Sequence, residues 1–373
     1  MVGLQTYLRP SGAATWSKCA GYAALCAALG TEYVEETDNE VREDGTACHW
    51  LADQVWNGSR PSVGSLSPNG REITEEMYAA VEEYHALLQS WEADATLEQT
   101  IRVSQAFPGV ADGTPDAWGA TDTTLDVADL KYGYRPVEVW RNPQLIIYAW
   151  TLVTLLAATG THVQQVRLHI VQPRAPHRDG TTRTWVTGIN ELGELAAQLS
   201  AAAAACYAPN PPCTPGPQCG NCPGAYGCRS LQAAAGRGME VAYDATPFVL
   251  NEAQVGYELH RLMQAQAHIE NRINGLSTQA ESLVRKGRQV PGFGLTRKAT
   301  RWRWRSDAIP YVQRLGELLG VDVMEDPRLK SVPKLRDAFP VDVQALYAEK
   351  PEGELKLRPV DPNEAIKAFM QKK

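Results

Sequence analysis

Two short segments of alternating apolar residues, joined by a polar turn, constrain the fold of this chain most strongly. The first includes residues 113–116, Gly-Thr-Pro-Asp, the turn is expected at residues 119–123, and the second covers residues 125–131. Such a pair predicts a β-hairpin. Because side chains alternate between the two faces of a strand, Asp129 and Lys131 are expected on one face, with Asp116 on the neighbouring strand.

Two carboxylates beside an ammonium suit the hydrolysis of phosphodiesters. A hard divalent cation prefers carboxylate oxygens, and a nearby lysine can orient the attacking water and offset the charge that develops on the phosphate. An acid two residues from a lysine is also common by chance, so a solvated strand edge with a salt bridge is the other interpretation. The flanking segments favour a phosphodiester-hydrolysing site over the solvated strand edge.

Two helical segments flank the hairpin and add polar residues to it. His49 lies in the helical pattern of residues 45–53. A second helix opens at Asn142-Pro143, and its Gln144 and Tyr148 are four residues apart, hence on one face. Each of these residues also has an ordinary interpretation, since a histidine can pack within a helix and Gln144 and Tyr148 can simply cover a core helix.

Four motifs therefore follow one another along the chain: a histidine after Gly-Thr, an aspartate after a second Gly-Thr, an acid-x-lysine strand and a Gln-x-x-x-Tyr helix. With these motifs the chain resembles the PD-(D/E)XK nuclease superfamily, and within it the RecB-like branch. The resemblance implies an α/β fold, a restriction-endonuclease-like core whose mixed central sheet is flanked by helices. It also implies that Gln144 and Tyr148 brace the catalytic lysine or contact a DNA phosphate.

The same resemblance implies the metal-binding residues. His49, Asp116 and Asp129 look like ligands of Mg²⁺ or Mn²⁺, and Lys131 looks like the catalytic lysine. Many members of the superfamily carry glutamate where this chain has Asp129. The shorter side chain leaves the metal distance and the preferred metal open.

Cysteines are the second signal, because half of them lie in or next to the Pro/Gly-rich segment 209–228. The first residues lack the apolar core of a signal peptide, so we expect a reducing cytoplasm, where disulfides are rare. Clustered thiolates in that setting indicate metal ligands. Three other cysteines, Cys26, Cys48 and Cys206, are expected to be packed thiols. The full set is Cys19, Cys26, Cys48, Cys206, Cys213, Cys219, Cys222 and Cys228.

The spacing Cys219-x2-Cys222-x5-Cys228 leaves a fourth ligand open. Cys213 would close a local tetrahedral zinc site of four thiolates. Cys19 would instead tie the N-terminal segment to the cysteine loop. CRISPR-associated RecB-like exonucleases and AddB-type nuclease domains carry one cysteine before the nuclease core and a similar trio after it. The resemblance thus implies a structural 4Fe-4S cluster held by Cys19 and the trio, with zinc as the alternative.

Basic residues are concentrated toward the end of a chain whose formal net charge is −7. Residues 1–238 carry 15 Lys and Arg against 25 Asp and Glu, whereas residues 239–373 carry 21 against 18. As a strand, residues 300–305 would present Trp302 and Trp304 on one face and arginines on the other, suited to base stacking and phosphate contact. Alternatively, the tryptophans anchor a small domain and the arginines are solvated. The candidate DNA contacts are Arg297, Lys298, Arg301, Arg303 and Arg305.

A length of 373 residues supports one large domain and a smaller one. We expect a nuclease domain over residues 1–236, with a strand at 97–107, and a smaller, mostly helical, DNA-contacting region over 237–373. A long helix is expected at 251–286. The longest apolar stretch, residues 145–158, is too short to span a bilayer and predicts a buried helix, so no membrane association is expected.

These features predict a metal-dependent DNA nuclease, and more specifically an exonuclease. The whole chain also resembles an uncharacterised family of phage and prophage proteins, which implies viral DNA replication or recombination, with a single-strand-binding protein or a helicase as partner and an oligomer as an option. The chain has no Gly-x4-Gly-Lys-Ser/Thr loop, so no ATP motor is expected within it. Two other classes stay open: a non-catalytic DNA-binding or scaffold protein that keeps the fold and the metal cluster, and a zinc-stabilised regulator.

Overall fold

Two compact units, Met1–Leu276 and Ser277–Lys373, make up the chain in the computed structural model. Helix α8 (Glu252–Arg285) begins in the first unit and ends in the second. The domain boundary predicted near residue 236 lies inside α7 (Arg229–Tyr243), and the division of roles between the two parts stays a prediction. The structure describes residues 3–31, 40–243, 249–297, 303–305, 308–325, 328–335, 338–339, 342–350 and 355–359.

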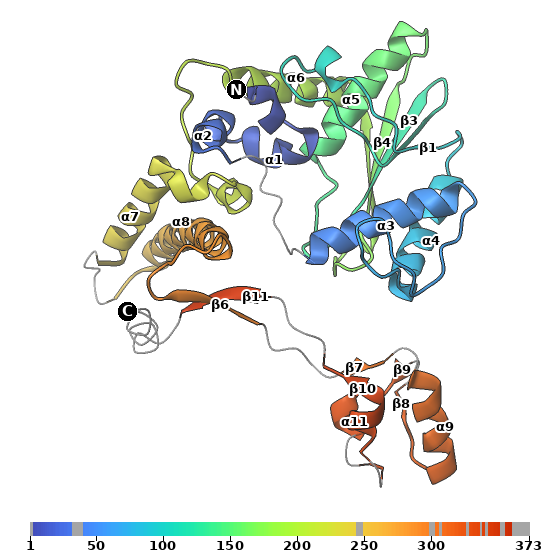
Figure 1. The fold of residues 1–373 in the computed structure, drawn as a ribbon. Helices are drawn as coiled ribbons and strands as arrows, with labels where there is room; N and C mark the ends of the chain where they lie inside the picture. Colours follow the sequence, from blue (N-terminus) through green and yellow to red (C-terminus); the bar gives the residue numbers. More distant parts are fainter. Residues whose placement is uncertain are drawn as a thin grey trace. The chain divides into compact units, whose positions relative to one another are not determined.

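A five-stranded mixed sheet forms the centre of the first unit (Figure 1). Its strands follow one another in chain order, and the only parallel pair is β3 with β4. This arrangement confirms the predicted α/β fold class with a mixed sheet flanked by helices. The strands are β1 (Thr96–Leu97), β2 (Ala117–Ala120), β3 (Thr124–Leu130), β4 (Gln165–Val171) and β5 (Thr182–Gly188).

Helices cover both faces of β3, which explains why this strand is buried along almost its whole length. On one face Val127 joins an apolar cluster with Leu145 of α5. On the other face Leu130 joins a cluster with Leu51 of α3 and Val81 of α4. Each fully buried aliphatic side chain of this kind contributes about 1.5–3 kcal/mol of transfer free energy. The covering helices are α3 (Glu40–Trp56), α4 (Glu75–Gln89), α5 (Pro143–Ala158) and α6 (Ile189–Ala205) (Figure 1).

Helix α5 is the crossover that makes β3 and β4 parallel, because parallel neighbours cannot be joined by a tight turn. The residues around its first turn define where the helix starts. The Asn142 side chain accepts hydrogen bonds from the backbone N–H groups of Gln144 and Leu145, and proline occupies the first helical turn. The predicted buried helix is therefore confirmed, and Gln144 is placed in its first turn.

The N-terminal segment packs against α5. Its short helices α1 (Ala13–Trp16) and α2 (Tyr22–Leu29) bury Trp16 and Tyr22 in the same apolar cluster as α5. This brings Cys19 into the fold next to the cysteine loop. Short 3₁₀ helices complete the unit at Leu4–Tyr7, Pro10–Gly12, Val103–Gln105, Pro217–Asn221 and Ala225–Gly227.

The strand predicted at residues 97–107 is wrong beyond its first residue. Backbone φ of Glu98 is +48°, a left-handed conformation that ends β1, and Val103–Gln105 forms a 3₁₀ helix. Ile101, Val103 and Phe107 are nevertheless buried. Their alternating pattern reflects packing of a turn-rich segment under the sheet, with an isolated bridge between Ile101 and Gly113.

The second unit combines short helices with two-stranded sheets around a small apolar cluster. Trp304 packs against this cluster, and its indole N–H donates to the carbonyl oxygen of Lys330. The sheets pair β6 (Phe293–Arg297) with β11 (Leu355–Pro359), β7 (Arg303–Trp304) with β10 (Ala348–Glu349), and β8 (Met324–Glu325) with β9 (Arg328–Leu329); the helices are α9 (Ile309–Leu319), α10 (Val332–Leu335) and α11 (Val343–Tyr347). Among the described residues of the chain, none of the helices has the length and apolarity needed to cross a bilayer.

Candidate active site

A cavity of about 490 Å³ opens where α3 passes the ends of β2 and β3. Three of the six residues predicted to bind metal or catalyse line it: His49, Asp116 and Lys131. His49 projects from α3, Asp116 precedes β2, and Lys131 follows β3 directly. The lining residues are Arg42, Gly45, Thr46, His49, Glu98, Asp116, Leu130, Lys131, Tyr132 and Gly133.

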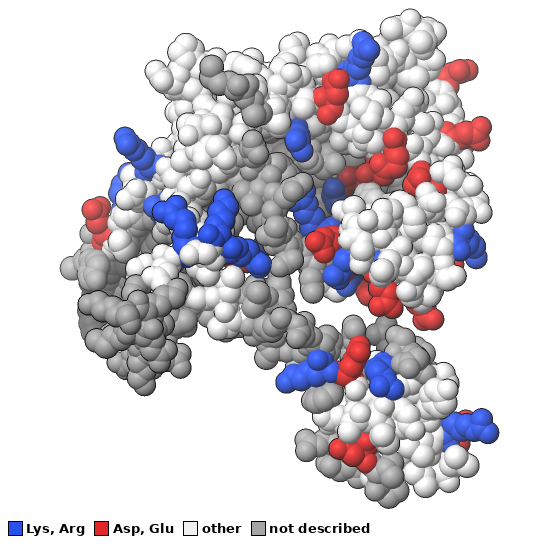
Figure 2. Space-filling view, viewed as in Figure 1, with Lys and Arg blue, Asp and Glu red and all other residues white. Residues whose placement is uncertain are grey.

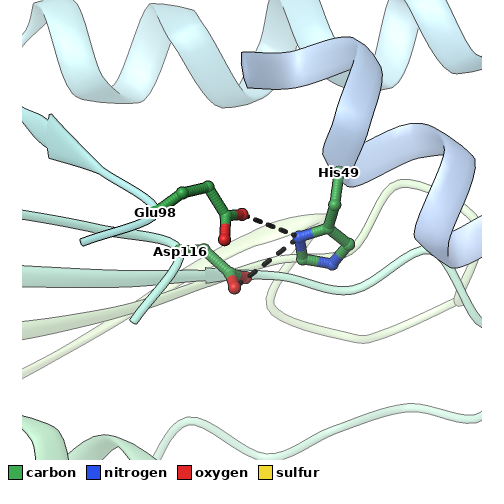
Figure 3. Close-up of side chains that lie close together, drawn as sticks. All are labelled: His49, Glu98 and Asp116. Atoms are coloured by element: carbon green, nitrogen blue, oxygen red, sulfur yellow. Dashed lines mark ion pairs between the residues drawn. The ribbon is translucent and has the colours of Figure 1, made fainter. Parts of the chain in front are cut away.

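His49, Glu98 and Asp116 converge at one side of this cavity (Figure 3). Nδ1 of His49 lies 3.6 Å from Oδ1 of Asp116 and 3.7 Å from Oε1 of Glu98. One ligand atom from each residue lies within 4.8 Å of the others, and among the described residues no other group of three metal-ligating side chains is this compact. One imidazole nitrogen and two carboxylates form a donor set suited to a divalent cation.

The electrostatics of these residues fit a cation as well. Burial alone lowers the pKa of His49, but the carboxylates of Asp116 and Glu98 outweigh it and raise the pKa to about 9. Burial raises the pKa of Asp116 above its ordinary value. Glu98 is exposed and Asp116 is partly buried, so a bound cation would chiefly offset the cost of keeping Asp116 charged.

Backbone contacts orient the Asp116 carboxylate and hold the backbone of Glu98 beside it. Oδ2 of Asp116 accepts a hydrogen bond of 2.7 Å from the backbone N–H of Leu130, across the β2–β3 pair. The backbone N–H of Glu98 donates to the carbonyl oxygen of Asp116 at 3.1 Å. Glu98 keeps its left-handed backbone at this point, and unusual backbone conformations of this kind often occur at functional sites.

Asp129, Lys131 and Gln144 form a second group beside the first. Nζ of Lys131 lies 2.9 Å from Oδ1 of Asp129 and 3.4 Å from Oε1 of Gln144. Nε2 of Gln144 donates to Oδ1 of Asp129 at 3.0 Å. Burial lowers the pKa of Lys131, but Asp129 and Asp116 outweigh it and raise the pKa above the ordinary value. The ammonium is therefore a charged donor at neutral pH.

Tyr148 does not line the cavity, but its hydroxyl shares a side-chain hydrogen bond with Gln144 beside it. Its side chain is 5% exposed and packs against the backbone that leads to Asp116. A methyl group on Gly113 would lie 2.9 Å from the tyrosine hydroxyl, which shows how closely the two segments approach. The structure thus brings His49, Asp116, Asp129, Lys131 and Gln144 together, and it places Tyr148 as a support for the strand segment.

Sequence reasoning missed Glu98. Its position beside Asp116 depends on the pairing of β1 with β2, in which Leu97 lies opposite Ala117. The only local signal is an acid at the end of a predicted strand, and that signal is common. Sequence reasoning also did not single out Arg42, which lies on the same face of α3 as His49, seven residues away.

One protein family, described as "Protein of unknown function (DUF2800)", matches residues 6–362 of the chain. The chain belongs to the DUF2800 family. A comparison with curated proteins gives no match for this DUF2800 chain. Among solved structures, it is similar to the crystal structure of an alkaline exonuclease (LHK-Exo) from Laribacter hongkongensis, with 17% sequence identity, a TM-score of 0.23, and coverage of 52% of this chain and 90% of that chain. At this TM-score the likeness carries no functional conclusion.

The DUF2800 chain brings five of its cysteines to one enclosed apolar cavity next to α2. Backbone N–H groups donate to three of these sulfurs, each at 3.4 Å: Thr214 to Cys19, Gly216 to Cys219 and Leu231 to Cys228. Among the described residues, no three of the cysteine sulfurs lie within 4.8 Å of one another. The cysteines that line the cavity are Cys19, Cys213, Cys219, Cys222 and Cys228.

The remaining three cysteines are buried in apolar surroundings. Burial raises the pKa of Cys48 to about 12 and that of Cys206 to about 11, as expected for packed thiols. Cys26 differs from the expectation in one respect. It shares a side-chain hydrogen bond with Cys222, which lowers the pKa of the Cys26 thiol and links this residue to the cysteine cavity.

The predicted basic segment is divided between two small sheets. Arg297 ends β6 opposite Leu355, and Arg303 lies in β7 opposite Glu349. Arg305 follows β7, and its backbone N–H donates to the carbonyl oxygen of Tyr347. Lys298 and Arg301 lie outside the described residues, as does Trp302. The anchoring of Trp304 in the small apolar cluster agrees with the alternative interpretation of the tryptophans, and DNA contact by the arginines stays a prediction.

Proposed function

We propose that this chain is a metal-dependent DNA nuclease that hydrolyses phosphodiester bonds, with exonuclease action as the expected mode. One observation carries the proposal. A compact group of metal-ligating side chains, His49, Glu98 and Asp116, lines the same cavity as Lys131, which forms an ion pair with Asp129. Cation ligands and a charged lysine side by side are what phosphodiester hydrolysis needs, whereas a surface salt bridge needs neither the histidine nor the cavity.

The residues present fit a divalent cation. His49, Asp116 and Glu98 would hold it, with Asp129 next to them, and the imidazole favours Mn²⁺ somewhat over Mg²⁺. Oδ2 of Asp129 is buried and forms an ion pair with the Lys131 ammonium at 2.9 Å, so a cation would share this carboxylate with the lysine. When bound, such an ion polarises a phosphoryl oxygen and lowers the pKa of a coordinated water.

The side chains supply the rest of the chemistry. Hydrolysis forms a bond from a water oxygen to phosphorus and breaks one phosphorus–oxygen ester bond. The Lys131 ammonium donates hydrogen bonds to the phosphate or to the attacking water and offsets the negative charge that develops. Gln144 holds Asp129 and Lys131 in place through its amide, and Arg42 offers a second cation for phosphate in the same cavity.

The test is digestion of 5′- and 3′-labelled single and double strands of DNA by the purified full chain with Mn²⁺. We expect stepwise shortening of the labelled strand, lost in Lys131→Ala and in His49→Ala. If the native protein stays inactive under these conditions but still binds DNA, and Lys131→Ala binds equally well, the non-catalytic scaffold function replaces this proposal. Comparing the 5′-labelled with the 3′-labelled strands also shows from which end the strand is digested.

We also propose that the cysteine cavity holds a structural 4Fe-4S cluster, with Cys19, Cys219, Cys222 and Cys228 as ligands. The N–H···S hydrogen bonds to three of these sulfurs support this assignment, because such bonds stabilise cluster-bound thiolates. A closed zinc site places sulfurs about 3.8 Å apart, since each lies about 2.3 Å from the metal. Cys213 shares side-chain hydrogen bonds with Cys19 and Cys228, so zinc held with Cys213 stays the alternative.

Visible absorption of anaerobically purified protein separates the two metals. A broad visible band is expected for iron–sulfur, and no band for zinc. Cys19→Ser is expected to abolish the band, whereas Cys213→Ser retains it. The reverse result would make Cys213 the fourth ligand and disconnect the N-terminal segment from the site.

DNA as the partner follows from the proposed reaction. Figure 2 shows basic side chains gathered over α8 on the face in view. Together with the predicted contacts at Arg297, Lys298, Arg301, Arg303 and Arg305, they would neutralise DNA phosphates. A role in viral DNA replication or recombination, a cytoplasmic location, and a helicase or single-strand-binding protein as partner remain predictions from the family resemblance.

A further inference from the structure

Helix α8 carries a repeat that the nuclease site does not use. Between residues 255 and 276 its apolar residues recur at alternating spacings of four and three, which is the heptad pattern of a coiled coil. Gln266 is the single polar residue in the series. The spacing continues in the sequence at Ala280 and Leu283. The stripe is formed by Val255, Leu259, Leu262, Gln266, Ile269, Ile273 and Leu276.

Five of the six apolar residues of this stripe are exposed in the structure, although large apolar side chains are usually buried; Ile269 is half-buried. Leu259 is 56% exposed and Ile273 55% exposed. Val255, Leu262 and Leu276 are likewise exposed. Apolar side chains aligned over about 32 Å of one helix form a larger patch than a monomeric surface usually leaves open.

A different face of α8 holds the helix to its own chain. Ala265 is buried, and a methyl group on Gly238 of α7 would lie 3.0 Å from its Cβ. Nδ2 of Asn271 donates to the carbonyl oxygen of Gly216 in the cysteine loop, and Arg272 donates to that of Ala225. Since α8 is docked through these residues, the stripe is not needed for its own packing in the first unit.

We propose that α8 pairs with α8 of a second copy of this chain as a two-stranded parallel coiled coil. The surface is self-complementary, as the two-fold symmetry of a homodimer requires. Burying the stripe together with Met263, which flanks it, removes roughly 600 Å² from each copy, about 1,200 Å² in total, which reaches the size of a specific interface. In this pairing the two Gln266 amides meet and can hydrogen bond to each other, the usual way in which a polar core residue sets register.

The charges that flank the stripe permit this pairing. In a parallel coiled coil each g residue faces the e residue five positions later on the partner helix. With Leu259 and Gln266 at a positions, the g residues Glu258, Ala265 and Arg272 lie opposite Met263, Glu270 and Ser277. Ala265 and Arg272 also keep their contacts with their own chain at this edge of the stripe. None of these pairs brings like charges together, so no repulsion opposes association.

Molar mass in solution, measured by light scattering and sedimentation equilibrium on the full chain, tests the proposal without any need for nuclease activity. We expect twice the chain mass of 40.9 kDa. The double variant Leu262→Glu with Ile273→Glu places charges in the stripe at exposed positions and is expected to weaken association at least about a hundredfold, to a monomer. Circular dichroism confirms that the variant keeps its helices.

The matched control places two glutamates on the opposite side of the same helix. His260 and Gln264 are both exposed, and His260→Glu with Gln264→Glu should leave the dimer intact. A native chain that stays monomeric at tens of micromolar overturns the proposal. A dimer that survives Leu262→Glu with Ile273→Glu overturns it as well, because the interface would then lie elsewhere. Gln266→Leu removes the polar core residue and is expected to tighten association and shift it toward higher oligomers.

Discussion

The ammonium nitrogen of Lys131 lies 2.9 Å from each carboxylate oxygen of Asp129. The two side chains project from the same face of β3 and its continuation, as strand alternation requires, and Gln144 of α5 contacts both. Because Asp129 is almost fully buried, its charge depends on this lysine and on any cation beside it. Removal of either partner therefore changes the chemistry of the site more than its packing.

Lys131→Ala is expected to lower the rate of DNA cleavage about 10²–10³-fold, since it removes a charged donor aimed at the reacting phosphate. Single-turnover cleavage of labelled DNA at saturating Mn²⁺ measures this effect. Arg178→Ala, which removes one positive charge from a side chain that is 89% exposed, should cleave at the native rate. Equal losses in both variants would mean that general charge, rather than the position of Lys131, drives cleavage.

Glu98→Gln is expected to raise the Mn²⁺ concentration needed for half-maximal activity by about 10–100-fold. The substitution keeps the size of the side chain but removes one of the two carboxylates that face His49. Metal titration of activity and of Mn²⁺ binding measures the shift. Glu92→Gln changes an acid that is 71% exposed and should leave the titration unchanged. An unchanged midpoint in Glu98→Gln would remove Glu98 from the ligand set.

Asp126→Asn is expected to destabilise the fold by about 2 kcal/mol at pH 7. Burial raises the pKa of Asp126, but hydrogen bonds from His169 and Arg167 outweigh it and lower the pKa below the ordinary value. Because the pKa is lower in the folded state, the ionised carboxylate stabilises the fold at pH values above its unfolded-state pKa of about 4. This contribution is lost as the pH falls through the folded-state pKa. The difference in the free energy of unfolding between the native protein and the variant should therefore shrink as the pH falls below about 4.

Urea unfolding at pH 7 and near pH 3 measures this difference. Asp122→Asn, on the exposed turn between β2 and β3, is the control and should match the native protein at both pH values. A difference between Asp126→Asn and native protein that stays constant with pH would contradict the assigned ion pair, because a purely steric effect does not titrate.

Gly21→Ala is expected to displace the cysteine loop without touching a cysteine. A methyl group there would lie 2.5 Å from the Cys213 sulfur and 2.8 Å from both the Cys213 backbone nitrogen and the Pro211 carbonyl oxygen. Backbone atoms cannot yield cheaply, so we expect a thermal midpoint lowered by several degrees and less iron per chain. Gly3→Ala has open space around its new methyl group and serves as the control. If the Gly21→Ala variant keeps the iron content and the stability of the native protein, this packing is contradicted.

Local chemistry made part of the site predictable. Strand alternation placed Asp129 and Lys131 on one face, and Asn142-Pro143 marked the start of α5, because both signals act within a few residues. The same reasoning failed at residues 97–107, where an alternating pattern continued past the left-handed backbone of Glu98. Backbone conformation of a single residue leaves little trace in the pattern of apolar side chains.

By itself, the sequence determined the hairpin, the α5 start, the order of the site residues and the spacing of the cysteine trio. Tertiary structure alone decided that Glu98 joins His49 and Asp116, that Tyr148 supports the site from below, and that Cys19 reaches the cysteine cavity. The physical reason is that alternation, capping and spacing act over a few residues, whereas these contacts join segments that only sheet pairing and burial of a shared core bring together.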